Sequence, residues 1–137
     1  MVQTLRPLAE ELAVDVELRE AFAESRAEWV DDPGAFRRTV GRFLSEPGEP
    51  PADGWETASD AAARFIAGLE EALVAASGAV VMCSGGRVLT AVLCRLGLVE
   101  PEAALDSWVA LRMPDVAIVR RGAGGWDLVV PFGSSTV

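Results

Sequence analysis

The chain has 137 residues, half of them apolar, and a mean hydropathy of +0.26, so it can bury roughly two-thirds of its unfolded surface around one core. Its net charge of −9 comes from acidic residues spread along the chain, which disfavours a nucleic-acid partner. No apolar run reaches the roughly 18 residues that a membrane helix needs, and residues 1–6 lack the shape of a signal peptide. We therefore expect one compact cytoplasmic domain without a membrane partner.

Missing residue types narrow the chemistry further. The 137 residues contain no histidine, which excludes Ser-His-Asp triads, phosphohistidine intermediates and His-ligated metals within them. They also contain no lysine, which excludes Schiff bases and the Walker-type phosphate loop. Cys83 and Cys94 form no Cys-x-x-Cys pair and are interpreted as small buried apolar residues in a reduced compartment. We expect no metal and no cofactor.

The first half of the chain predicts two helices. Apolar residues recur at helical spacing over about 3–13, and Pro7 falls in the first turn, where proline is tolerated. The alternating segment 14–18 predicts a short strand or extended segment. The second helix is expected over about 33–44, and the Pro- and Gly-rich stretch 46–54 predicts an internal loop.

The second half predicts helices around a strand and then a hairpin. Thr57 or Ser59 can cap a long helix that ends near 77–78. The apolar segment 79–83 has no alternation, which is typical of a strand covered on both faces of a parallel sheet. Another helix follows and stops at Gly97. The final hairpin is expected over 115–120 and 126–131, around the turn Gly122-Ala-Gly-Gly125. These elements predict an α/β fold in three layers, with helices on both faces of a mixed, mostly parallel sheet.

Ser84-Gly85-Gly86-Arg87 is the segment best placed to carry chemistry. It joins the predicted strand 79–83 to a helix start, where glycines expose backbone N–H groups and a guanidinium can add charge. Such a turn can bind an anion, and phosphate is the natural candidate. The alternative, equally weighted, is that Gly85 and Gly86 serve only the tight turn. Ser84 as a nucleophile would need a base, and no histidine or lysine is present to act as one.

Several motifs resemble the histidine phosphatase superfamily, the phosphoglycerate mutase-like group. The matching segments are Gln3-Thr4-Leu5, Gly54-Trp55-Glu56 with Arg64-Phe65, Val80-Val-Met-Cys-Ser-Gly-Gly86, Leu96-Gly97-Leu98, and the closing hairpin with Pro131-Phe-Gly-Ser-Ser135. The resemblance extends over essentially all of 1–137, as one domain that is N-terminally incomplete relative to the family. It implies the phosphoglycerate mutase-like α/β fold and a lineage that hydrolyses or moves phosphomonoesters.

The resemblance also assigns roles to single residues. Glu24 falls on the proton-donating carboxylate of the family's Leu-x-Glu segment, with Phe22 in place of the leucine. A solvated carboxylate among neighbouring acids remains the alternative. Ser84 falls on the second family histidine, and the nucleophilic Arg-His-Gly has no counterpart. Glu24 and Ser84 are thus the candidate catalytic residues, and Gly85, Gly86 and Arg87 the candidate anion site.

These departures predict a catalytically impaired hydrolase of small phosphorylated metabolites. One lost charge-stabilising donor typically costs on the order of 10²-fold in rate, and loss of the nucleophile costs more. We expect a phosphorylated small molecule or inorganic phosphate as partner, and a possible homodimer. A start assigned too far downstream would explain the missing Arg-His-Gly, but it would not restore Ser84. The alternative function is a non-catalytic module that binds an anion or a partner, a pseudo-phosphatase.

Overall fold

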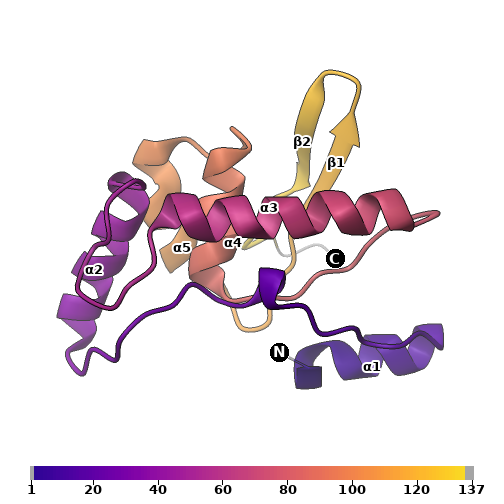
Figure 1. The fold of residues 1–137 in the computed structure, drawn as a ribbon, viewed down its shortest axis with the longest axis horizontal. Coiled ribbons are helices and arrows are strands. Elements are labelled where there is room, and N and C mark those ends of the chain that lie inside the picture. The colour runs from indigo at the N-terminus through magenta and orange to yellow at the C-terminus, as the bar shows by residue number, and fades with distance from the viewer. Residues whose placement is uncertain (1, 135–137) are drawn as a thin grey trace.

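The computed structural model describes residues 2–134, and its regular elements are mostly helices (Figure 1). The helices are α1 (Val2–Leu12), η1 (Glu20–Phe22), α2 (Pro33–Ser45), α3 (Ala58–Ala75), α4 (Gly86–Arg95), η2 (Pro101–Ala103) and α5 (Ala104–Val109). They confirm the expected helices at 3–13, 33–44, 58–77 and 87–96. The short helix α5 was not predicted from the sequence.

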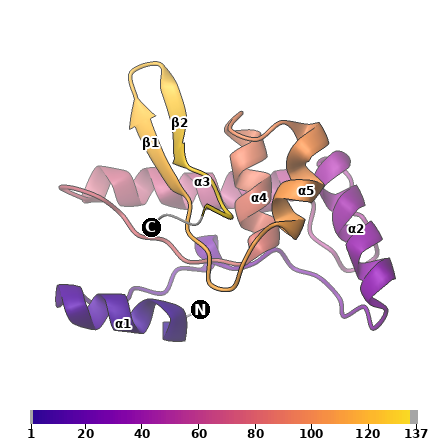
Figure 2. The same ribbon diagram turned by 180° about the vertical axis from the view of Figure 1, so that it is seen from behind.

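The core forms where α2, α3, α4 and α5 pack together. We call this packed set the helical core; its fully or nearly fully buried side chains include Val40, Phe43, Trp55, Ala61, Phe65, Val88 and Ala104. Helix α3 packs mainly on α4, and α5 packs on both α4 and α2. Figures 1 and 2 show α3 as the long axis of the molecule, with α2, α4 and α5 gathered around its N-terminal half. This packing buries apolar side chains along one face of each of α2, α3 and α4.

The helix ends follow the local chemistry of the sequence. The side chain of Thr57 accepts a hydrogen bond from the Asp60 N–H at 3.0 Å, so Thr57, and not Ser59, caps α3. Asp32 caps α2 in the same way, and Pro33 opens that helix. Gly97, with a φ of 70°, follows the end of α4 in the left-handed region that glycine tolerates. These signals fix where the core helices begin and end.

The C-terminal hairpin is present as predicted, with shifted bounds. Strands β1 (Ile118–Gly122) and β2 (Gly125–Val130) pair antiparallel, and Gly122 lies opposite Gly125 across the turn. The hairpin projects away from the helices in both views (Figures 1 and 2). Arg121 pairs with Glu70 and so ties β1 to α3. Ser135, which belongs to the matching segment at the end of the hairpin, lies outside the described residues.

The predicted mixed, mostly parallel sheet is not found. Among residues 2–134 the only sheet is the two-stranded hairpin, and segments 14–18 and 79–83 are not strands. A strand requires the N–H and C=O groups of a neighbour, and no backbone hydrogen bond of segment 79–83 is found in the described part of the chain. The apolar composition of 79–83 was therefore interpreted wrongly as evidence of a buried strand.

Helix α1 lies apart from the helical core, across an apolar groove. The groove has a volume of about 570 Å³ and is lined by α1, by segment 14–19, by the end of α3 and by segment 79–83. We call it the N-terminal groove. Among its lining residues, Leu18 is 77% exposed and Val81 is 58% exposed. Both views show α1 below the C-terminal end of α3, joined to the rest by an extended stretch (Figures 1 and 2).

Candidate functional site

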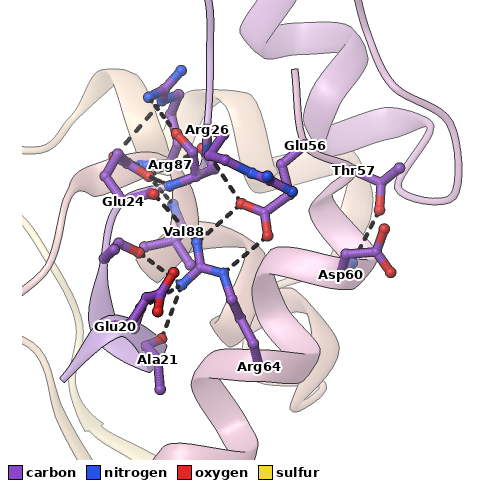
Figure 3. Close-up of polar contacts among 12 residues, drawn as sticks. Glu20, Ala21, Glu24, Arg26, Glu56, Thr57, Asp60, Arg64, Arg87 and Val88 are labelled. Atoms are coloured by element: carbon purple, nitrogen blue, oxygen red, sulfur yellow. Dashed lines mark hydrogen bonds and ion pairs between the residues drawn. The ribbon is translucent and has the colours of Figure 1, made fainter. Parts of the chain in front are cut away.

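Arg64 on α3 organises the loop that carries the candidate acid. Its guanidinium donates hydrogen bonds to both carboxylate oxygens of Glu56, at 2.9 and 3.0 Å. It also donates to the carbonyl oxygens of Ala21 and Ala23 at 2.9 Å and of Glu24 at 3.2 Å (Figure 3). A guanidinium presents its donors in a rigid fork, so these contacts fix the path of segment 21–24 against α3.

Glu56 is the buried partner of this arginine. Its side chain is 6% exposed, and its second oxygen also accepts the Arg26 N–H at 3.1 Å. Hydrogen bonds from Arg64 are the main reason that the pKa of Glu56 lies below its ordinary value of 4.5, although burial opposes them. The sequence placed Glu56 and Arg64 in a family-like motif; in the structure the pair holds both ends of segment 21–26.

Glu24 lies at the N-terminal end of α4. One carboxylate oxygen accepts the Val88 N–H at 2.9 Å, the Ser25 N–H at 2.7 Å and the Ser25 hydroxyl at 3.1 Å. The other accepts the Arg87 N–H at 3.1 Å. A Cβ atom on Gly85 would meet this carboxylate, so a larger residue there would displace Glu24 from the turn. Glu24 is therefore bound by the very turn that the sequence proposed as an anion site.

Arg87 points inward and not toward solvent. Its guanidinium lies 4.9 Å from the centre of the Trp55 ring and 5.9 Å from that of Phe36. It donates to the Ser25 carbonyl at 3.0 Å, and its Nε lies 3.7 Å from Glu24. The Nη1 atom is buried without a hydrogen-bond partner in the described residues. Aromatic faces and a carboxylate thus hold this cation against the start of α4.

Ser84 lies beside this cluster but is not joined to it. Its hydroxyl is buried, and no hydrogen-bond partner for it is found within residues 2–134. The structure therefore brings Glu24, Gly85 and Arg87 into contact, and it places Gly86 against Leu111 and Trp108. No described contact gives the Ser84 hydroxyl a base.

Four further residues at the site were not predicted from the sequence. Ser25 binds Glu24 and Arg87, and the rings of Trp55 and Phe36 cover the arginine. The fourth residue is Glu20. The segment Leu18-Arg19-Glu20 matches the Leu-x-Glu motif directly, without the substitution at Phe22 that the alignment on Glu24 needs. Glu20 is exposed at the start of η1, near Arg64 (Figure 3). The literal motif was the signal that could have indicated it.

The described residues offer neither a metal site nor a membrane span. No group of three or more Cys, Asp or Glu side chains there could hold a metal ion. No helix there is long and apolar enough to cross a membrane. Cys94 is partly buried, and burial raises the pKa of its thiol.

Comparison with known families identifies the class of protein. The model of the histidine phosphatase superfamily (branch 1) matches residues 1–131, and the chain belongs to this superfamily. Neither the curated proteins nor the solved structures contained a match. The superfamily implies an α/β fold, of which the described residues show helices and a hairpin without a parallel sheet.

Proposed function

We propose that the chain recognises a phosphorylated small molecule or inorganic phosphate at segment 84–87, and that these 137 residues do not transfer phosphate through a phosphohistidine. The superfamily binds phosphorylated substrates, which supplies the ligand class. The claim that these residues form no phosphohistidine is supported by the absence of any histidine among them. Ser84 lies at the end of segment 79–83, at the position of the second family histidine. A serine hydroxyl cannot supply the imidazole nucleophile or its cationic hydrogen bond.

The residues present support binding better than turnover. Gly85, Gly86 and the start of α4 supply backbone donors, and Arg87 supplies a cation beside them. In the role of a proton donor, Glu24 would have to release the Arg87 and Val88 N–H groups that now hold its carboxylate. Glu20, exposed and near Arg64, is the second carboxylate that could take that role. Neither has a phosphorylated residue to act on.

The test is hydrolysis of an aryl phosphate by the purified chain. We expect no release of the phenol above buffer. Ser84→Ala and Glu24→Gln variants separate enzyme from contaminant, because a contaminant is unaffected by either change. Turnover that either substitution abolishes would overturn the proposal and make that residue a catalytic one.

A second candidate is a module that binds a protein partner. The observation that favours it is the N-terminal groove, where Leu12, Leu18 and Val81 are each more than half exposed. Exposed apolar surface of this kind is typical of an interaction site. A measurement of self-association distinguishes this candidate function from phosphate recognition.

A further inference from the structure

We infer that the anion-binding turn of this protein is closed by its own Glu24, an internal carboxylate that competes with any external anion for the start of α4. This inference rests on the proposed recognition of phosphate at segment 84–87. The first observation is geometric: the N–H groups of Arg87 and Val88, which an external anion would need, already donate to the Glu24 carboxylate at 3.1 and 2.9 Å.

A second observation points to an anion larger than the carboxylate. Two polar atoms beside the turn, the Ser84 hydroxyl and Nη1 of Arg87, are buried and have no partner among the described residues. A buried donor without a partner is costly, so groups of this kind need an explanation. Glu24 satisfies the backbone donors but neither of these two. A tetrahedral oxyanion has more acceptor oxygens than a carboxylate and can satisfy more of them.

The remaining contacts explain why Glu24 stays in place. Arg64 holds the carbonyl groups of Ala23 and Glu24 by hydrogen bonds, so the backbone of this loop keeps the Glu24 carboxylate next to the start of α4. Ser25 adds two donors from the adjacent position. A tethered ligand has a high effective concentration, so external phosphate at millimolar levels competes poorly with it. The closed turn is therefore an autoinhibitory contact, and its release requires Glu24 to leave.

The experiment compares phosphate binding by the wild type with that by Glu24→Ala. The alanine variant removes the internal carboxylate and leaves the donors of Ser25, Arg87 and Val88 available. We expect its Kd for inorganic phosphate to be at least about tenfold lower than that of the wild type, as charge-assisted bonds to the backbone become available. Titration by NMR, followed at the amides of residues 85–88, measures both. The matched control is Glu49→Ala, which removes an exposed carboxylate from the loop between α2 and α3.

Thermal unfolding gives an independent readout. Glu24→Ala should have a lower Tm than the wild type, and phosphate at about twenty times its Kd should restore about 6 °C. Formate, the size of the deleted carboxylate, should restore part of this shift, while sodium chloride at equal ionic strength should not. Glu49→Ala should show no anion-dependent recovery.

The possible results distinguish closure of the turn by Glu24 from phosphate recognition at segment 84–87. Equal phosphate affinity of wild type and Glu24→Ala overturns the closure and leaves phosphate recognition standing. No binding and no anion-dependent recovery in either protein overturns both, because the turn is then only a helix start. If Glu24→Ala does not fold, Glu24→Gln replaces it. The neutral amide keeps the size of the side chain, and phosphate should bind this variant more tightly than the wild type because the competing negative charge is gone.

Discussion

The helical core and the N-terminal groove are built from the same kinds of apolar residue, yet only the first is sealed. Val40 and Phe43 are fully buried between α2 and its neighbours, while Leu18 and Val81 are more than half exposed across the groove. The difference lies in the partner elements, since α2, α3, α4 and α5 pack on one another, whereas segment 79–83 has no backbone hydrogen bond to a described neighbour and only its Met82 packs against the core. Apolar composition alone does not decide burial; a covering element does.

The site lies at the boundary between these two regions. Two segments connect the groove to the helical core. Segment 79–84 leads from the groove to the start of α4, and segment 14–26 leads from α1 to the residues that Arg64 contacts. Glu24 and Glu56 therefore connect a loosely covered half of the molecule to a packed one. We therefore expect the stability of the chain to depend on the helical core and on this boundary, and its self-association to depend on the N-terminal groove.

The largest effect is expected in the helical core. Phe43→Ala removes a fully buried ring from α2, and a change of this type costs about 3–5 kcal/mol of unfolding free energy. Leu18→Ala, the matched change in the groove, should stay within about 0.5 kcal/mol, because this side chain is 77% exposed. Urea unfolding followed by circular dichroism measures both. Similar losses for the two variants would contradict the contrast between the regions.

Arg64→Ala should have the next largest effect, at the boundary. The change leaves the buried Glu56 carboxylate without its main partner and frees the carbonyl groups of segment 21–24. We expect a loss of about 2–3 kcal/mol, below the usual cost of breaking a fully buried pair, because the Arg64 side chain is 27% exposed. Arg64→Lys should recover only part of it, since an ammonium cannot reproduce the fork.

The pH dependence of stability provides the control for Arg64. The pKa of Glu56 is lower in the folded chain than its ordinary value of 4.5, so its contribution is complete above that value and is lost as the pH falls through the folded pKa. Unfolding free energy of the wild type should therefore fall in acid more steeply than that of Arg64→Ala. Equal slopes for the two proteins would show that the ion pair contributes little to stability.

The sequence predicted the core helices well and the sheet badly, for a physical reason. Thr57, Asp32 and Gly97 act through contacts with near neighbours, so local chemistry locates the helix ends. Segment 79–83 shows only that its residues are apolar, while strand formation depends on a neighbour that no local pattern reveals. The sequence therefore shows that segment 79–83 is apolar, but it cannot show whether the segment forms a strand.

At the site, too, local features could be predicted from the sequence and contacts between distant segments could not. Gly85 and Gly86 before a helix indicated backbone donors, and those donors are present. What the sequence could not show is that Glu24, 63 positions before Arg87, supplies the anion. That contact depends on Arg64 holding a distant loop, and only the assembled fold brings these segments together.

The smallest expected effect concerns self-association through the groove. Segment 79–83 presents an apolar edge whose backbone groups have no partner in the described chain, and such an edge can pair with a second copy. We expect light scattering at about 100 µM to give a mass above the 14.5 kDa monomer. Val81→Lys should weaken this association by about 1 kcal/mol, because a charged side chain on an edge opposes pairing. Val109→Lys on α5, where the valine is 45% exposed, should leave the association unchanged.

A wild type that stays monomeric and unfolds cooperatively would show that the exposed segment does not drive association. Equal weakening by both variants would assign the effect to overall charge.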